Sequence, residues 1–180
     1  MKRALRFLLA AVAVVAAAFG YVHMQEDIRG LPPGSPAPTF RLPSLAGGEV
    51  DLQSLRGRLV VLNFWATWCA PCVAEMPSLE RLYRALGREG LTVLSVSVDE
   101  DETALRFTER AGLTFPILRD PGGRTAARAY RASAYPQTVV IDAGGQVKEH
   151  WRGPAQWDTP EAIEHFRGLL TPAPARSPSE

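Results

Sequence analysis

The sequence contains little cysteine and histidine and has no excess of charge of either sign. Two cysteines and three histidines occur among 180 residues, and the histidines, His23, His150 and His165, lie far apart along the chain. A zinc site takes about four ligands, so this scatter disfavours one, and we expect no metal site. Twenty basic and 19 acidic residues give a net charge of +1. Because a nucleic-acid-binding protein shows a strong basic bias, we expect no nucleic-acid partner.

The first 22 residues differ in composition from the rest. Three basic residues, Lys2, Arg3 and Arg6, precede the uncharged 16-residue run FLLAAVAVVAAAFGYV. This pattern is typical of an export signal or a membrane anchor. The run is marginal for a membrane-spanning helix, which needs roughly 20 apolar residues, and residues 16–18 form a small-residue stretch suited to signal cleavage. The basic start predicts export of the chain that follows.

We therefore expect residues 1–22 to be a signal anchor in the cell membrane, with the following domain on the exported, periplasmic side. A cleaved signal peptide and a soluble periplasmic protein are the alternative. A buried N-terminal helix of the folded domain is a less favoured interpretation.

Proline and glycine mark the limits of the folded domain. The segment RGLPPGSPAP, residues 29–38, holds four prolines and two glycines, a composition typical of a linker. The C-terminal segment TPAPARSPSE has the composition of a flexible tail. We expect a linker over 23–36, one domain over 37–170 and a tail over 171–180, a size that suits a single domain.

Strand and helix patterns alternate within this domain. Apolar runs with turn residues between them predict strands, and apolar residues at helical spacing predict helices. The expected elements are a hairpin of 39–45 and 49–55, strands at 59–66 and 91–98, helices at 70–86, 101–112 and 122–130, a hairpin of 137–142 and 146–153, and a helix over 159–170 that begins at Asp158 or Thr159. This order predicts an α/β sandwich with a mixed sheet.

Both cysteines lie where the first long strand passes into a helix. Cys69 precedes the predicted helix and Cys72 is one turn further along. The first turn of a helix presents unpaired N–H groups and the positive end of the helix dipole, which favour the nucleophilic thiolate of Cys69. Cys72 is then close enough to attack a mixed disulfide at Cys69. Pro71 suits the start of a helix, and C-x-x-C beside a strand–helix unit is typical of a redox site.

Other uses of the cysteine pair remain possible at this point. A purely structural disulfide normally closes a longer loop, because its stabilisation rises with loop size. Zinc would need two further ligands. Copper bound by Cys69, Cys72 and a histidine is chemically reasonable, with His150 as the candidate histidine.

The stretch NFWATWCAPCVAEMPSLERL resembles the exported, membrane-anchored TlpA/ResA-like thiol–disulfide oxidoreductases of thioredoxin fold. The matching positions are Asn63, Phe64, Trp65, Trp68, the two cysteines, Glu75 and Pro77, together with SAYPQTVVID around Pro136. The resemblance covers roughly residues 35–170. It implies a thioredoxin-like sandwich, with a central mixed sheet flanked by helices, an N-terminal hairpin and a central insert within 99–135.

The resemblance also implies roles for individual residues. Cys69 would be the nucleophile and Cys72 the resolving cysteine, joined in a redox-active disulfide. Pro136 falls on the family's cis-proline. It would place Tyr135 beside Cys69 and leave the Tyr135 backbone free to pair with an extended substrate segment. We therefore expect substrate binding by Trp68, Pro71, Tyr135 and Pro136.

Glu75 is the candidate acid/base. It lies three residues after Cys72 on the predicted helix, so the two side chains share a face that points toward the strand. A carboxylate near the low-dielectric surroundings of that strand has a raised pKa. It would accept and return the proton of Cys72. An exposed helix glutamate is the alternative interpretation.

The family implies exported protein disulfides or dithiols as substrates, a membrane electron donor and no cofactor. Members that serve cytochrome c maturation often carry Gly-Val-x-Gly-x-Pro before an acidic residue, whereas this chain has RASAYP followed by Gln137. The sequence therefore supports a role in dithiol exchange more strongly than a role in cytochrome c maturation.

Two alternatives use other chemistry on a similar fold. Copper carriers of this fold tend to space their cysteines by three residues, not two. Peroxidases of related fold carry Pro-x-x-x-Thr/Ser-x-x-Cys, and this chain has Leu62 and Ala66 at those positions relative to Cys69. Both remain alternatives to a thiol–disulfide oxidoreductase.

Overall fold

A computed structural model describes residues 12–18 and 30–170 of the chain. The chain divides into two compact units, Met1–Gly30 and Leu31–Glu180. Within the first, residues 12–18 are helical. Among the described residues, no helix has both the length and the apolar character needed to cross a membrane. Most of the expected anchor and linker, and all of the expected tail, lie outside the described residues.

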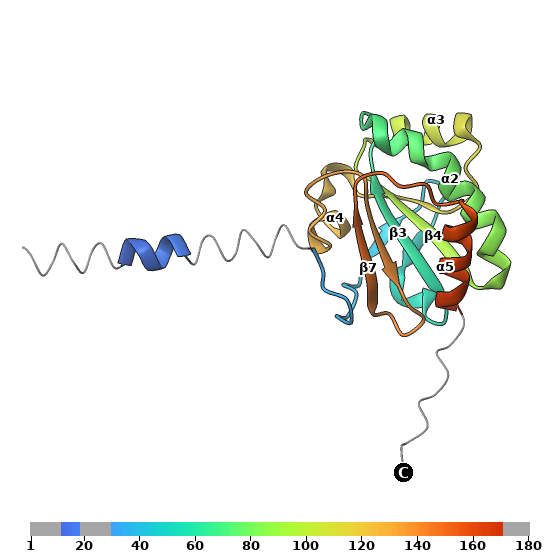
Figure 1. The fold of residues 1–180 in the computed structure, drawn as a ribbon. Coiled ribbons are helices and arrows are strands. Elements are labelled where there is room, and N and C mark those ends of the chain that lie inside the picture. Colours follow the sequence, from blue (N-terminus) through green and yellow to red (C-terminus); the bar gives the residue numbers. More distant parts are fainter. Residues whose placement is uncertain (1–11, 19–29, 171–180) are drawn as a thin grey trace, which may run out of the picture. The chain divides into compact units, whose positions relative to one another are not determined.

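The second unit is built on a five-stranded mixed sheet (Figure 1). The strand order is β5-β4-β3-β6-β7, with β3 parallel to β4, β4 parallel to β5, and β6 antiparallel to both β3 and β7. The strands are β3 (Leu59–Trp65), β4 (Leu91–Ser97), β5 (Ile117–Arg119), β6 (Gln137–Ile141) and β7 (Val147–Arg152). A separate antiparallel hairpin joins β1 (Arg41–Pro43) to β2 (Glu49–Asp51). The expected mixed sheet and opening hairpin are confirmed.

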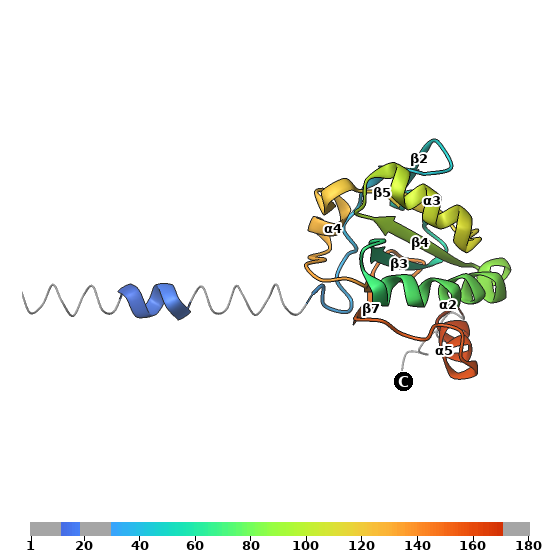
Figure 2. The ribbon, with the colours of Figure 1, turned by 90° about the horizontal axis from the view of Figure 1, so that it is seen from above.

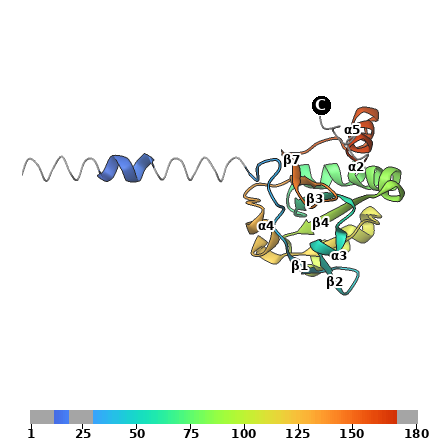
Figure 3. The same cartoon turned by 90° about the horizontal axis from the view of Figure 1, so that it is seen from below.

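Helices cover both faces of the sheet. Figure 2 shows α2 (Ala70–Leu86) and α5 (Pro160–Leu170) on one face and α3 (Asp101–Ala111) on the other. The hairpin of β1 and β2 lies on the α3 side (Figure 3). The remaining helical pieces are α4 (Ala126–Ala129) and the 3-10 turns Leu52–Leu55, Gly87–Glu89 and Pro121–Gly123. Thr159 begins α5, since its hydroxyl accepts a hydrogen bond from the Ala162 amide.

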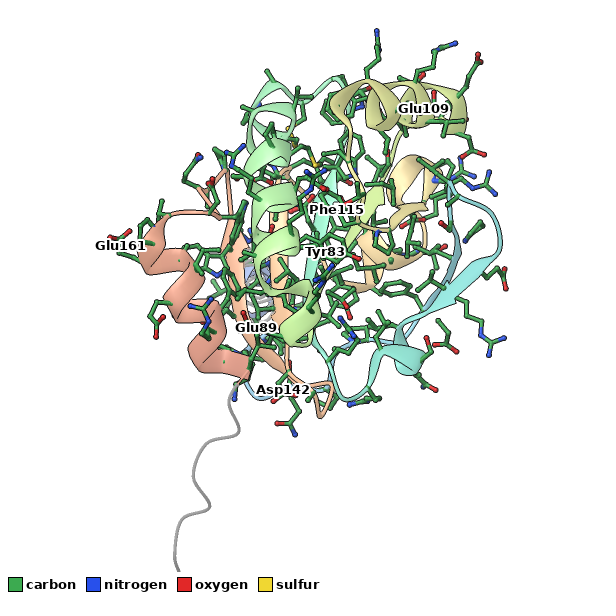
Figure 4. The ribbon with its side chains drawn as sticks, turned by 90° about the vertical axis from the view of Figure 1, so that its right-hand side faces the viewer. Tyr83, Glu89, Glu109, Phe115, Asp142 and Glu161 are labelled. Atoms are coloured by element: carbon green, nitrogen blue, oxygen red, sulfur yellow. A yellow bond between two sulfur atoms is a disulfide. The ribbon has the colours of Figure 1, made fainter. Side chains whose placement is uncertain are left out.

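The central strands are buried along their whole length. Every residue of β3 and β4 is buried, as expected for near-continuous apolar strands that are covered on both faces. Helix α2 packs its apolar stripe onto this layer, and its Tyr83 contacts Phe115 edge-on at 6.1 Å between ring centroids (Figure 4). The result is a continuous hydrophobic core that holds the start of α2 rigidly against the end of β3.

Strand β5 was not predicted. It has only three residues, and it follows Pro116 without the length or alternation that marks a strand. Tertiary contacts create it: β4 pairs along one edge, Ser44 bridges to Leu118, and the Leu45 amide donates to the Ile117 carbonyl.

The described end of the expected linker is hydrogen-bonded to the sheet. The Leu31 amide donates to Nδ1 of His150 at 3.0 Å, and Ser35 accepts a hydrogen bond from the Val147 amide at 2.9 Å. These bonds to β7 hold a proline-rich segment whose composition alone indicates a linker.

The buried carboxylate of Asp120 organises the segment that carries α4. It is 3% exposed and accepts hydrogen bonds from the amides of Thr125 and Ala127, each at 2.9 Å. We expect Asp120→Ala to lower the free energy of unfolding by about 1–3 kcal/mol, because the buried amide of Ala127 and the partly buried amide of Thr125 lose their acceptor. Urea denaturation measures this. Glu102→Ala, which removes an exposed α3 pair with Arg106, is the control and should change it by less than about 0.5 kcal/mol. Equal effects of the two substitutions would contradict the assignment.

Candidate active site

The cysteine pair lies at the junction of β3 and α2. After Trp65 the chain turns through four residues, and Cys69 becomes the N-cap of α2. Its amide donates to the Ala66 carbonyl at 3.2 Å, and its sulfur accepts a hydrogen bond from the Cys72 amide at 3.3 Å. The Cys69 sulfur therefore takes the place of the side-chain oxygen that usually caps a helix.

Cys69 and Cys72 form a disulfide, with their Cα atoms 5.3 Å apart. The two residues differ in exposure: Cys69 is 7% exposed and Cys72 is 0% exposed. Of the two cysteines, Cys69 is therefore the more accessible to an incoming sulfur. The expected pair is present, and this asymmetry gives each cysteine a distinct environment. Pro71 lies between them in the first turn of α2 and is exposed.

Asp99 holds the loop before the cysteines, a role that the sequence analysis missed. Its carboxylate accepts hydrogen bonds from the Thr67 amide at 2.7 Å and the Ser97 hydroxyl at 3.1 Å. It therefore ties the end of β4 to the active-site loop. Only the spatial pairing of β3 and β4 brings these residues together, so no local pattern could reveal it.

The segment before β6 lies beside the loop that carries Cys69. Phe64 near the end of β3 pairs with Gln137 at the start of β6, which brings the preceding residues to the same edge of the sheet. The Tyr135–Pro136 peptide bond is cis, as the resemblance implied. Trp68 is 69% exposed, and its ring meets that of Tyr135 edge-on at 5.9 Å. This contact joins the residue before Cys69 to the residue before the cis-proline.

The Tyr135 backbone is open to a further strand. In the part of the chain that the structure describes, neither its amide nor its carbonyl makes a hydrogen bond to other backbone groups. Burial, and to a lesser degree the negative charge of Asp120, raise the pKa of the Tyr135 phenol. The side chain is therefore neutral at physiological pH.

Glu75 is buried, contrary to the interpretation as an exposed helix glutamate. It is 2% exposed. Its Oε1 accepts a hydrogen bond from Asn63 Nδ2 at 2.9 Å, and its Oε2 accepts from the Ala155 amide and from Trp157 Nε1, each at 3.1 Å. Burial raises the pKa of this carboxyl, and the hydrogen bonds from Ala155, Trp157 and Asn63 offset part of that rise.

A row of polar side chains crosses the sheet beneath Glu75. Asn63 of β3 pairs in register with Ser95 of β4 and Thr138 of β6. Its amide donates to the Thr138 hydroxyl at 3.0 Å, and its carbonyl oxygen accepts from the Ser95 hydroxyl at 3.1 Å. All of these residues are buried. The sequence analysis named Asn63 as a position that matches the family. It did not predict this hydrogen-bond network, because the residues of the network come from three strands.

The histidine considered for copper lies in different surroundings from the cysteines. His150 lies on β7, where it pairs with Val139 of β6, and its Nδ1 accepts a hydrogen bond from the Leu31 amide. Burial lowers the pKa of its imidazole. Among residues 12–18 and 30–170, no three His, Cys, Asp or Glu side chains gather in a metal-binding arrangement.

The chain is similar to known thiol–disulfide oxidoreductases. Residues 33–150 match the AhpC/TSA family. The chain is 39% identical over 178 residues to the thiol-disulfide oxidoreductase ResA of Geobacillus kaustophilus, covering 96% of this chain and 100% of that protein. It is 36% identical over 169 residues to ResA of Halalkalibacterium halodurans, covering 91% and 93% of the two chains.

Solved structures agree with this relationship. A putative thiol:disulfide interchange protein DsbE from Chlorobium tepidum superposes with a TM-score of 0.72 at 30% identity, covering 78% of this chain and 99% of that one. A putative protein disulfide isomerase from Bacteroides thetaiotaomicron gives a TM-score of 0.70 at 28% identity, covering 78% and 91%. With its thioredoxin-like fold and its C-x-x-C disulfide at the start of α2, the chain belongs to the AhpC/TSA family, among the ResA-like thiol–disulfide oxidoreductases.

Proposed function

We propose that this oxidoreductase reduces disulfides in exported partner proteins, with Cys69 as the nucleophile and Cys72 as the resolving cysteine. The observation that carries the proposal is the unequal exposure of the two sulfurs at the start of α2. The outer sulfur, that of Cys69, meets the partner, whereas the inner sulfur, that of Cys72, is shielded from it. Cys72 can therefore react efficiently only with a disulfide that already includes Cys69.

The position of Cys69 favours its thiolate. Its sulfur accepts the Cys72 amide hydrogen bond, and the positive end of the α2 dipole lies at the same point. Both interactions stabilise negative charge on sulfur, which lowers the pKa of a thiol in this position.

The exchange proceeds in two displacements. In the reduced protein the Cys69 thiolate attacks one sulfur of the partner disulfide, and the other partner sulfur leaves as a thiolate. Cys72 then loses its proton to Glu75 and attacks the Cys69 sulfur, which expels the second partner thiolate. The Cys69–Cys72 disulfide results, and the partner gains two electrons. Its two thiolates take up two protons, one returned by Glu75 and one from solvent. A membrane electron donor would return two electrons and restore the dithiol.

Trp68, Pro71, Tyr135 and Pro136 form the proposed docking site for the partner, in which Pro136 is buried and acts by shaping the backbone at Tyr135. Trp68 and Pro71 are exposed beside the outer sulfur, and the unpaired Tyr135 backbone suits the addition of an extended partner segment as a further strand. Main-chain pairing of this kind tolerates different partner sequences, as a general disulfide reductase requires.

The proposed location is the exported side of the cell membrane, with residues 1–22 as the anchor. The basic residues that precede the apolar run support this orientation. Cleavage of the same segment would instead release a soluble periplasmic protein.

Trapping tests the nucleophile and the resolving cysteine. We expect reduced Cys72→Ser protein to accumulate a mixed disulfide with insulin, because nothing displaces the partner from Cys69. The parent should reduce insulin without a lasting adduct, and Cys69→Ser should do neither. Non-reducing electrophoresis with mass spectrometry measures the adduct. Adducts formed equally well by both serine variants would overturn the assignment.

The acid/base role of Glu75 predicts a specific pH dependence. When the reduced protein reacts with Ellman's reagent, a first phase loads Cys69 and a second, unimolecular phase releases the bound thiol through Cys72. Because ionised Glu75 accepts the proton, the second phase should accelerate as pH rises through the raised pKa of Glu75.

Glu75→Gln should slow this second phase about 100-fold near neutral pH and remove the acceleration that depends on Glu75. Stopped-flow absorbance separates the two phases. Glu109→Gln, which alters an exposed glutamate of α3 (Figure 4), is the matched control. Second-phase rates of Glu75→Gln that match those of the control at every pH would refute the role.

A further inference from the structure

The segment between β7 and α5 is fastened to α2 at Glu75. Two of its donors, the Ala155 amide and Trp157 Nε1, bind the same carboxylate oxygen. The Trp157 amide also donates to the Ser78 hydroxyl at 3.3 Å, and that hydroxyl donates to the Glu75 carbonyl at 2.7 Å. Trp157 therefore contacts this turn of α2 through both its backbone and its side chain.

Packing fixes the direction of the Trp157 indole N–H. Trp157 is 2% exposed, and its ring contacts those of Trp151, at 5.8 Å between ring centroids, and Phe166, at 6.1 Å. A buried ring packed against two others has little freedom to turn, so its N–H is a fixed donor for the carboxylate.

Three neutral groups donate hydrogen bonds to the Glu75 carboxylate. They are Asn63 from β3 and Ala155 and Trp157 from the 153–158 segment, and Cys72, one turn away on α2, is the titratable neighbour on the same helix. Each of the three donors therefore carries a large share of the stabilisation of a buried charge.

We propose that Trp157 is a positioning residue for the exchange reaction, whose indole N–H orients the Glu75 carboxylate and stabilises its charged form for proton transfer from Cys72. This inference rests on the proposed acid/base role of Glu75. Trp157 does not touch the reacting sulfurs; it acts through the carboxylate. Through Trp157, the rings of Trp151 on β7 and Phe166 on α5 are connected to the chemistry at the start of α2.

The test compares Trp157→Phe with Glu109→Gln in the second phase of the Ellman reaction over a range of pH. Trp157→Phe keeps an aromatic ring but removes the donor, so the acid limb of the rate profile should move to higher pH by about one unit, the size expected for one hydrogen bond to a charge. At a fixed pH on that limb the rate falls about tenfold. Glu109→Gln alters an exposed glutamate of α3, on the other face of the sheet from α2, and should leave the limb in place.

A double variant separates positioning from general damage. In the Glu75→Gln background, Trp157→Phe should cause no further shift, since the group it acts on is gone. A parental acid limb in Trp157→Phe, an equal slowing at every pH, or a shift that persists in the double variant would each overturn the inference. Insulin reduction by the parent in the same series tests the proposed function separately, so either can fail without the other.

Near-ultraviolet circular dichroism of the parent provides a measurement that does not depend on how Trp157→Phe folds. Protonation of Glu75 changes the hydrogen bond to the indole, so the tryptophan signal should titrate at the pH of the acid limb. The same transition should be absent in Glu75→Gln. A parental signal that stays constant across the acid limb would also overturn the inference.

Discussion

The hydrogen bond from the Cys72 amide to the Cys69 sulfur is the contact on which the reactive site depends. It forms because β3, buried along its whole length, ends where α2 begins, so the first amides of the helix point at the sulfur. Asp99 keeps the intervening loop in place from β4. A rigid core therefore presents one sulfur to solvent and keeps the other beneath it, which is the asymmetry that ordered dithiol exchange requires.

The buried side of the site shows how a carboxylate is kept inside a hydrophobic core. Removing Glu75 from water is costly, and hydrogen bonds from Asn63, Ala155 and Trp157 offset part of that cost. The row formed by Ser95, Asn63 and Thr138 extends this network across three strands. Polar groups at the centre of the sheet are thus satisfied by one another, and the Glu75 carboxylate is held by donors from two separate parts of the chain, β3 and the segment between β7 and α5.

The exposed side of the site is built differently. The rings of Trp68 and Tyr135 meet edge-on, and the Tyr135 amide and carbonyl make no backbone–backbone hydrogen bond within the described residues. In the proposed reaction the partner would dock at these rings and main-chain groups, whereas buried Glu75 would handle the proton. Such a separation would allow one reactive centre to accept many partners without exposing its acid/base group to solvent.

The sequence by itself determined the redox pair, the strand and helix that carry it, and the α/β class, because these follow from local spacing and apolar periodicity. Its family resemblance also located the cis-proline. Tertiary structure alone decided the three donors around Glu75, the anchoring of the loop by Asp99, the short strand β5 and the bonding of the described end of the expected linker to the sheet. Each of these depends on hydrogen bonds between residues distant in the chain, and such bonds leave no periodic trace in the sequence.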